Sequence, residues 1–511
     1  MASWRTRVSL ATLGHRLQAV PMLLMLVPFT LGIVLHESYL IPLGLAIVAM
    51  LLTALATWLL LPRWSAWCYA AATLLLLGYG VAELRAPHSS TPYNTTIDMV
   101  VQIESTPRMR TGYSVADGRI ISWQGDGDRH HADDKVLLWL RSDSIDYGHR
   151  LSIASRLTPR ISRHESYDHL MHRRGYVGGI SIDDHNILSY SHATPKPSLQ
   201  QRATERLRQH LRDSSSYAVV EAMVAGSREY MPPSLRETYA TTGLAHLMAV
   251  SGLHLGIVMV IITSLLLPLR LLHHGHRIAN AIAIAAIWLF AVMSGLSPSV
   301  VRAALMLSIL QIALMGTVRY NSLNALSVAA FAMLAYRPNY LYDISFELSV
   351  MAVAGILLWA IPIVGRLRIG RWLPRILLTA IIIGSAATLW TLPLVSHTFG
   401  NIPIASIVLT PIVMIFAYII VICGILSLIL PTALASATMA VAEWAAQIQN
   451  SVVEYSATLP YASINHTMSD AEVMMCYATY IAITLLAASI NRKKVVTLSY
   501  VDTPRDRAPQ E

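Results

Sequence analysis

The segment 243–257, GLAHLMAVSGLHLGI, places polar groups that could do chemistry inside apolar sequence. His246 and His254 are eight residues apart, and Ser251 and Gly252 lie between them. Ionisable groups at membrane depth are costly and usually face a cavity or a partner. A Ser/Gly pair is a common place for a helix to kink, and the apolar stretch 243–271 is too long for one upright span. We therefore expect a short half-helix, a break near Ser251 and Gly252, and then a full span, an arrangement that occurs where membrane helices line a water-filled cavity.

A second polar cluster lies at 294–306, SGLSPSVVRAALM, and contains Ser297 and Ser299. Pro298 suits the first turn of a helix, where its missing N–H leaves no hydrogen bond unmade. Arg302 then stands one turn into an apolar helix. Two interpretations are open: an arginine whose charged head reaches the membrane surface, or an arginine that serves a polar pathway inside the bundle.

A third cluster, DISFELSVMAVAGI at 343–356, carries two carboxylates four residues apart. Asp343 and Glu347 share a helix face and are expected at the same end of their span as Arg302. A buried ion pair offsets the desolvation of both partners, so we predict that Arg302 pairs with Asp343 or Glu347. The alternative is two solvated acids at a helix start, a position that acidic residues favour.

A fourth feature is the sequence TFGNIPIAS at 398–406. Gly400, Asn401 and Pro403 predict an interrupted membrane segment. It is either a re-entrant loop in which Asn401 lines a pathway, or an ordinary loop followed by a long span.

The elements that must position these residues are mostly membrane helices. Of the 511 residues 54% are hydrophobic and 13% charged, and the mean hydropathy is +0.51, whereas soluble domains are about a quarter charged. We predict a polytopic α-helical membrane protein of roughly 10–12 spans, some broken or re-entrant, with an inserted external small β-barrel. The expected parts are three N-terminal transmembrane helices at 1–84, an external OB-like β domain at 85–198, amphipathic connecting helices at 199–240, a second transmembrane domain at 241–490, and a polar tail at 491–511.

Orientation follows from the placement of arginine. The basic N-terminus and the arginine-rich loops of the second membrane block agree on a cytoplasmic N-terminus. The β domain is then external, while the side of the C-terminus stays open. Much of the net charge of +9 reflects this topology, so it carries little weight as evidence for a nucleic-acid partner.

The polar region predicts β structure. Runs at 99–104, 118–123, 135–140, 150–157 and 176–182 are rich in Val, Ile, Leu and aromatic residues and are separated by Gly, Asp and Ser. Five short strands fit a small barrel such as the OB-fold, which binds oligonucleotides. The stretch 199–213 predicts a helix, either a solvated linker or a helix that contacts lipid headgroups or DNA.

Several chemical sites receive no support from the sequence. The three cysteines, Cys68, Cys423 and Cys476, lie in apolar segments and predict no disulfide framework. We find no zinc-type spacing and no nucleotide-binding loop. The sequence therefore predicts no catalytic residue, no metal and no cofactor.

At these residues the sequence resembles the ComEC competence family, whose members are inner-membrane DNA uptake channels. Order and spacing agree over about residues 20–490. Many members continue into a metallo-β-lactamase-like domain, whereas this sequence stops at Glu511 without an HxHxDH motif, so we expect a form that lacks that domain. The segments that carry the resemblance are GLAHLMAVSGLHLGI, SGLSPSVVRAALM, NSLNALSVAAFAMLAYRPNYLYDISFELSVMAVAGI, HTFGNIPIASIVLTP and YGHRLSIASRLTPRISRHESYDHLMHRRGYVGGI.

The resemblance implies a channel that passes single-stranded DNA across the inner membrane during natural transformation. Its implied partners are single-stranded DNA, the lipid bilayer, a periplasmic DNA receptor and a cytosolic helicase-like ATPase. The candidate channel residues are His246, Ser251, Gly252, His254, Ser297, Ser299, Arg302, Asp343, Glu347 and Asn401. The candidate DNA-binding residues of the β domain are Arg150, Arg156, Arg160, Arg163, Arg173 and Arg174, with Tyr167 and Tyr176 as possible stacking partners.

Two other classes of function remain open. Ser251 with nearby histidines is compatible with an intramembrane serine hydrolase, which needs a base hydrogen-bonded to the serine and an oxyanion hole. A small-solute or lipid transporter is the other alternative, and the external β domain counts mildly against it.

Overall fold

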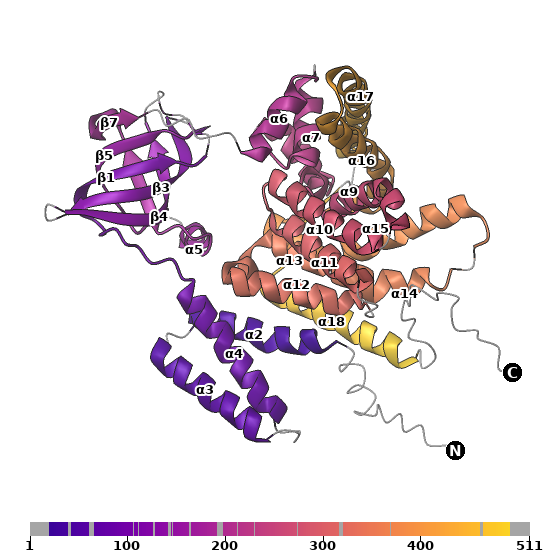
Figure 1. Cartoon of the computed structure of the whole chain (residues 1–511), viewed down its shortest axis with the longest axis horizontal. Coiled ribbons are helices and arrows are strands. Elements are labelled where there is room, and N and C mark those ends of the chain that lie inside the picture. The colour runs from indigo at the N-terminus through magenta and orange to yellow at the C-terminus, as the bar shows by residue number, and fades with distance from the viewer. Residues whose placement is uncertain are drawn as a thin grey trace. The chain divides into compact units, whose positions relative to one another are not determined.

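The fold is described from a computed structural model of the chain (Figure 1). The chain forms two compact units. One is built from the described parts of 1–28, 198–336 and 343–511, and the other from those of 29–197 and 337–342. The structure describes residues 20–490 except 39–41, 61–65, 106, 111, 126–127, 142–144, 146, 163–164, 192–197, 212, 229, 273, 316–319, 368 and 460–462. The predicted tail at 491–511 lies outside the described residues.

Three apolar helices lie on the N-terminal side of the chain, as predicted. They are α2 (Pro21–Ser38), α3 (Leu43–Leu60) and α4 (Ala66–Leu84). α3 packs along α4, and α2 meets α4 at two glycines. A Cβ on Gly32 would lie 1.9 Å from the carbonyl oxygen of Leu75, and one on Gly78 would lie 2.1 Å from that of Phe29. Glycine therefore lets the two backbones touch, as small residues do between membrane helices.

A curled sheet follows α4. Its strands are β1 (Thr96–Ile103), β2 (Arg108–Arg110), β3 (Tyr113–Gly125), β4 (Asp128–Leu140), β5 (Arg150–Arg156), β6 (Gly178–Ile182) and β7 (Ile187–Ser191). Their order is β6-β4-β3-β1-β5-β7, with β2 paired to β3. β6 runs parallel to β4, and the other pairs are antiparallel. The five predicted strands are confirmed, and β2 and β7 are additional.

The sheet curls until its β5 and β6 sides meet. Thr158, just after β5, exchanges two backbone hydrogen bonds of 3.0 and 2.9 Å with Gly179 of β6. A Cβ on Gly178 would lie 2.2 Å from the Thr158 carbonyl oxygen, so glycine is what permits this close contact. Alternate side chains such as Met99, Leu151 and Ile180 point inward and form the apolar core. The helix α5 (Glu165–Arg173) and the 3-10 turn η1 (Asp184–Asn186) join the later strands.

The helical unit begins with short helices. They are α6 (Leu199–Arg208), α7 (Ser214–Val224), α8 (Pro233–Thr241), the 3-10 turn η2 (Ala245–Met248) and α9 (Gly252–Leu265). Ser198 caps α6 by a reciprocal pair of hydrogen bonds with Gln201, of 3.1 and 2.8 Å. α7 is buried from Ser216 to Val224, because it packs against α16 and α17.

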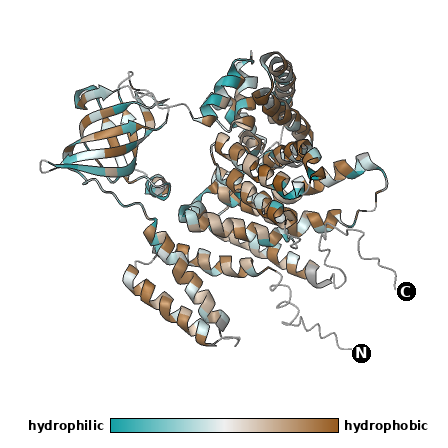
Figure 2. Cartoon of the chain, in the orientation of Figure 1, coloured by the Kyte–Doolittle hydropathy of each residue, from teal (hydrophilic) through white to brown (hydrophobic). Residues whose placement is uncertain are grey.

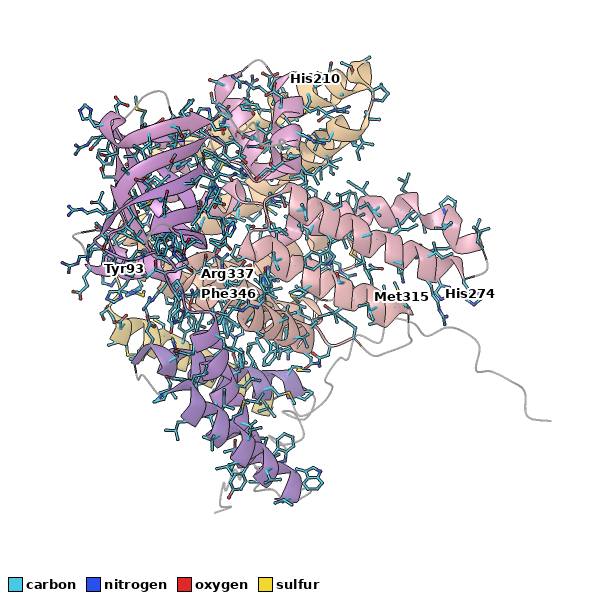
Figure 3. The ribbon with its side chains drawn as sticks, turned by 60° about the vertical axis from the view of Figure 1, so that its left-hand side comes forward. Tyr93, His210, His274, Met315, Arg337 and Phe346 are labelled. Atoms are coloured by element: carbon cyan, nitrogen blue, oxygen red, sulfur yellow. The ribbon has the colours of Figure 1, made fainter. Side chains whose placement is uncertain are left out.

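Longer helices build the rest of this unit. They are α10 (Gly275–Met293), α11 (Pro298–Met315), α12 (Ser322–Tyr336) and α13 (Ile344–Gly355), the last continued by a π-helical turn η5 (Ile356–Ala360) and α14 (Ile361–Val364). The 3-10 turn η3 (Leu267–Leu271) precedes α10. α10 and α11 pack side by side in opposite directions, and Figure 3 shows His274 at the start of α10 near Met315 at the end of α11.

The C-terminal part contains α15 (Trp372–Phe399), α16 (Ser406–Ile429), α17 (Thr432–Ala457) and α18 (Asp470–Ile490). Two short strands, β8 (Asn401–Ile402) and β9 (Ile464–Asn465), pair with each other. Gly400 ends α15 with φ +70°, a left-handed conformation that favours glycine. The predicted break at 398–406 is present, and it links two helices that are each long enough to cross a membrane, which fits an ordinary loop followed by a long span.

Seven of the described helices are long and apolar enough to cross a membrane. Four shorter apolar helices accompany them, at 21–37, 43–59, 252–265 and 322–336. Figure 2 shows hydrophobic residues along these helices and an alternation of hydrophobic and hydrophilic residues in the strands. The architecture suits a multi-pass membrane protein that carries a curled β sheet. The number of long helices is lower than the number of spans predicted, because several apolar helices are shorter than a span.

Candidate functional site

The break in the segment 243–257 lies where it was predicted. The 3-10 turn η2 ends at Met248, Ser251 is extended with φ −114° and ψ 172°, and α9 begins at Gly252. The helix that follows has 14 residues, which corrects the prediction of a full span. It ends at Leu265 because the 3-10 turn η3, which contains Pro268, interrupts the apolar stretch.

His254 is held against the start of its own helix. The backbone N–H of Ser251 donates to His254 Nδ1 at 2.9 Å. In the neutral ring the proton then sits on Nε2. The residue is 1% exposed, and Nε2 has no hydrogen-bond partner among the described residues. The ring therefore carries an unused donor at the N-terminus of α9.

His246 lies on the other side of the break. It belongs to η2, is exposed, and its Nδ1 lies 3.1 Å from the carbonyl oxygen of Gly243. The break thus separates a buried histidine from an exposed one. The residue pattern of a continuous helix would not have predicted this difference in exposure.

Arg302 stands one turn into α11, as predicted, and its residue is only 5% exposed. Its Nε donates to the hydroxyl of Ser349 on α13 at 2.9 Å, and this hydroxyl lies 3.0 Å from that of Ser299. Nη1 contacts the sulfur of Met306 at 3.5 Å. Among the described residues no carboxylate forms an ion pair with Arg302. The arginine is therefore buried inside the bundle and held by the hydroxyl of Ser349.

The predicted ion pair between Arg302 and Asp343 or Glu347 is wrong. Asp343 is the N-cap of α13, and its Oδ1 accepts a hydrogen bond from the Ser345 backbone at 2.8 Å. Glu347 lies one turn later, near Tyr477 of α18. Asp343 therefore caps its own helix. The guanidinium bonds instead to Ser349, a residue that the sequence analysis did not name as a candidate. The sequence pointed to Ser349 only by its position in the same segment as the two acidic residues.

The structure brings the first and second clusters together. α9 packs against α11, and a Cβ on Gly252 would lie 3.4 Å from Arg302 Nη2 and 3.3 Å from the Ala303 Cβ. The guanidinium therefore lies against the first residue of α9. Ser297, at the start of α11, has a buried hydroxyl without a hydrogen-bond partner among the described residues.

Asn401 lies at a different contact. Its Nδ2 donates to the carbonyl oxygen of Ala240 at 3.4 Å. Close by, a Cβ on Gly243, which has φ +73°, would lie 2.4 Å from the Pro403 Cβ and 2.9 Å from the Ser406 Cβ. The residues after α15 thus pack against the start of the segment 243–257, on the N-terminal side of the break at Ser251.

The arginines of the β domain occupy several places on that domain. Arg150 and Arg156 lie at the two ends of β5, and both are exposed, as are Arg160 and Arg174. Arg173 is half-buried, forms an ion pair with Glu37 and stacks 4.2 Å over the ring of Tyr342. These contacts make it a structural residue. Arg163 lies outside the described residues.

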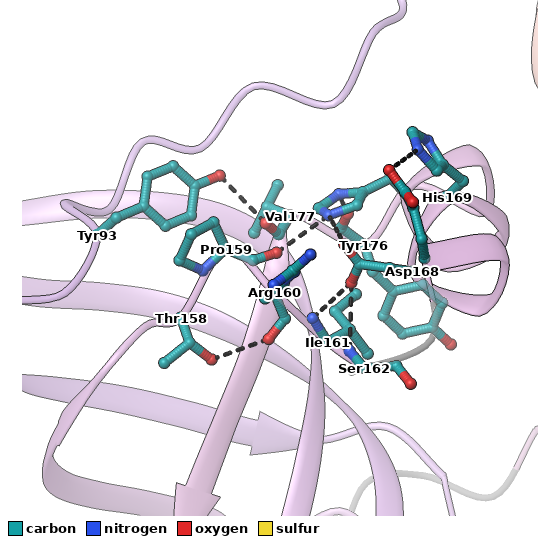
Figure 4. A network of polar contacts seen from close by, with 12 residues as sticks. Tyr93, Thr158, Pro159, Arg160, Ile161, Ser162, Asp168, His169, Tyr176 and Val177 are labelled. Atoms are coloured by element: carbon teal, nitrogen blue, oxygen red, sulfur yellow. Dashed lines mark hydrogen bonds and ion pairs between the residues drawn. The ribbon is translucent and has the colours of Figure 1, made fainter.

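Around Arg160 the chain is fixed by polar contacts (Figure 4). Asp168 of α5 accepts from the backbone N–H groups of Ile161 and Ser162, at 2.6 and 3.3 Å. The two ring nitrogens of His172 lie 2.9 and 3.0 Å from the carbonyl oxygens of Tyr176 and Pro159. This network anchors α5 to the end of β5 and holds the exposed Arg160 on an ordered segment.

Of the two predicted stacking residues, only one offers a free face. Tyr176 is 5% exposed, and its hydroxyl donates to Asp117 at 2.7 Å. Burial and this hydrogen bond raise the pKa of Tyr176 well above its ordinary value. Tyr167 on α5 is 43% exposed. Tyr176 is therefore part of the core, and Tyr167 remains a candidate.

The chain matches a known protein family. The family model described as competence protein matches residues 223–493, which is more than half of the chain. No solved structure matches.

Three curated relatives are similar to parts of the chain. ComE operon protein 3 of Bacillus subtilis is 28% identical over 134 residues, 26% of this chain and 17% of that protein. An uncharacterized protein of Aquifex aeolicus is 27% identical over 54% of this chain and 62% of its own length. The uncharacterized protein YcaI of Escherichia coli is 24% identical over 57% of this chain and 39% of its own length. The chain thus covers less than two thirds of each relative.

The family match covers α9, α11, α13 and the interrupted segment after α15, so it contains every candidate channel residue. On this evidence the chain belongs to the ComEC competence family.

Proposed function

We propose that this protein forms a channel that passes single-stranded DNA across the inner membrane during natural transformation. The family suggests a role in DNA uptake for competence. The observation that carries the proposal further is the buried guanidinium of Arg302, which lies against the start of the short helix α9 inside an apolar helical unit. A DNA strand carries one negative charge on each phosphate and needs fixed positive groups along a hydrated path.

The break before α9 supports the same proposal. Non-helical backbone at membrane depth is tolerated where protein buries it or water reaches it. Here Ser251 is extended, His246 is exposed, and the interrupted segment after α15 packs next to Gly243. A break at Ser251 that meets the loop after α15 fits a transport pathway through a helical bundle.

The β domain would receive the strand. Its curled sheet is compatible with an OB-like barrel, and exposed arginines at both ends of β5 and at Arg160 offer phosphate contacts. In this proposal the domain is external, the N-terminus is cytoplasmic, and a periplasmic DNA receptor and a cytosolic helicase-like ATPase act with the channel. Binding should be weak and should fall steeply with salt, because phosphate contacts release counterions.

A serine hydrolase is the less favoured alternative. The contact between Ser251 and His254 joins the ring to the backbone amide, whereas a nucleophile needs its hydroxyl hydrogen-bonded to the base. A small-solute or lipid transporter is a further alternative. Labelling of Ser251 by a fluorophosphonate would support the hydrolase and count against the channel.

The test has a genetic arm and a chemical arm. Deletion of the gene should abolish transformation while external DNA binding persists. In a background in which Cys68, Cys423 and Cys476 are replaced by alanine, single cysteines at 246 and 251 should react with a small hydrophilic thiol reagent added outside. Leu255, which is 0% exposed, provides the matched control, and a cysteine there should stay protected.

Two results would overturn the proposal. One is normal transformation in the deletion strain. The other is complete protection of cysteines at 246 and 251 in a folded protein that still transports, because a hydrated path must reach these residues.

A further inference from the structure

No ion pair within the described part of the chain involves Arg302. The residue is 5% exposed, and its contacts are with the hydroxyl of Ser349 and the sulfur of Met306. Neither group carries a charge. A buried ion without an opposite charge is costly, since the interior screens it poorly and does not solvate it as water does. Such a site is stabilised when an anion enters it.

The start of α9 adds to this positive potential. A helix N-terminus carries unpaired N–H groups and roughly half a positive charge. Arg302 Nη2 lies beside Gly252, the first residue of α9, at 3.4 Å from the position of a Cβ. Two positive groups placed next to each other repel unless an anion lies between them or next to both. Gly252 has no side chain, so the guanidinium can lie close to its backbone.

Arg302 on α11 and His254 on α9 each have an unused donor. Arg302 uses Nε and Nη1, and no hydrogen bond from Nη2 reaches a group in the described part of the chain. On α9, His254 Nε2 is buried without a partner, while Nδ1 is occupied by the Ser251 amide. Ser349 orients the guanidinium through its hydroxyl oxygen, and the hydroxyl of Ser299 contacts that of Ser349. The site thus has an oriented cation and unused N–H donors, and none of the ion pairs among the described residues supplies an acid to it.

We propose that Arg302 and the N-terminal turn of α9 bind a phosphate group. The planar guanidinium matches two phosphate oxygens, which is why arginine is preferred at such sites. That the phosphate belongs to a DNA backbone rests on the proposed function, and free inorganic phosphate is the other source of the same chemistry. A strand would then pass through the helical unit with one phosphodiester at a time held at this position.

The test measures ligand-dependent thermal unfolding of the full-length protein purified in mild detergent at low, constant chloride. The probes are inorganic phosphate, an oligothymidylate, and a methylphosphonate oligothymidylate that has the same bases but no backbone charge. The wild-type midpoint should rise with phosphate and with the charged oligonucleotide, and should not rise with the uncharged one. Arg302→Met should raise the half-saturating concentration of both active probes at least about tenfold, because a charge-assisted hydrogen-bond pair is lost.

Matched variants separate binding from folding. Arg236→Met removes an exposed arginine of the same helical unit, which bonds to the Arg228 carbonyl oxygen, and should leave the response intact. If Arg302→Met does not fold, Gly252→Ala tests the site in its place. It keeps every charge but puts a methyl group 3.4 Å from Nη2, and it should also weaken the response to phosphate.

The outcomes are distinct. An equal midpoint rise in wild type and in both site variants would overturn the phosphate site, whatever the transformation assay shows. A response to inorganic phosphate that needs Arg302, without a response to oligothymidylate, would support the anion site and count against a DNA path through it. The proposed function is judged separately, by transformation in the deletion strain.

Discussion

The contact between Arg302 and Ser349 can be tested by a double-mutant cycle on the stability of the protein in detergent. The hydroxyl of Ser349 accepts a charge-assisted hydrogen bond at 2.9 Å from a guanidinium that is 5% exposed. A hydrogen bond to a charged group contributes about 1.5–3 kcal/mol, and a lone buried charge adds a desolvation penalty. Ser349→Ala should therefore lower the free energy of unfolding by about 1.5–3 kcal/mol in the presence of Arg302.

In the background of Arg302→Met the same serine change should cost much less, because the hydroxyl no longer has a charge to bond. The expected coupling energy is about 1–2 kcal/mol. Ser308→Ala on the same helix α11 provides the matched control, since its hydroxyl donates to the Ala304 carbonyl oxygen and accepts from Trp288 Nε1 rather than from Arg302. Its effect should add to that of Arg302→Met.

The free energies would be measured by equilibrium denaturation of the purified variants. A coupling below about 0.5 kcal/mol between 302 and 349 would refute the hydroxyl partner. The pair Arg302→Met and Asp343→Asn should be additive within the same limit. Strong coupling in that pair would restore the ion pair that sequence reasoning favoured.

Three further predictions concern stability. Gly78→Ala should lower the free energy of unfolding by about 1–3 kcal/mol, because its Cβ would lie 2.1 Å from a carbonyl oxygen of α2. Gly44→Ala should be neutral in the same thermal unfolding assay, because no atom lies within 4 Å of its Cβ position. Tyr239→Phe should lower the free energy of unfolding by about 1–3 kcal/mol, because the buried side-chain amides of Gln449 and Asn450 lose their hydrogen bonds to its hydroxyl. Tyr455→Phe, at an exposed position, should leave the stability unchanged. Because the folded pKa of Tyr176 is raised, the stability it contributes is complete below the ordinary tyrosine pKa of about 10 and is lost as pH rises above it, so Tyr176→Phe should flatten the alkaline loss of stability.

Sequence patterns predicted the backbone features that depend on residue type. The Ser/Gly pair at 251–252 marked a helix start, and Gly400 with Pro403 marked an interruption, because these residues act on φ, ψ or the N–H group directly. The five strands were found from their Val and Ile runs. β2, with the sequence RMR, carries no such run, so only the fold reveals it, whereas β7, ILSYS, has Ile, Leu and Tyr but was not predicted.

The sequence alone did not determine which side chains meet between helices. The charges of Asp343 and Glu347 suggested a mate for Arg302, yet the choice depends on how α11 and α13 are rotated about their axes. That rotation presents Ser349 to the guanidinium and leaves Asp343 to cap its own helix. Apolar helices without a clear hydrophobic face carry little information about rotation, so the pairing needs coordinates.

The choice of serine over a carboxylate next to Arg302 leads to a last prediction. A hydroxyl orients a guanidinium without cancelling its charge, whereas an attached carboxylate would occupy the site at a high effective concentration and exclude any phosphate. Ser349→Asp should therefore supply the missing counter-charge and abolish phosphate-dependent stabilisation and transformation, while the folded protein persists. Ser349→Asn has nearly the same shape without the charge and is the control. If the aspartate and asparagine variants respond equally to phosphate in the thermal assay, the charge of Arg302 is not what holds the anion. If only the aspartate variant loses the response, the anion is held by the uncompensated positive charge of Arg302, which a serine at position 349 leaves available.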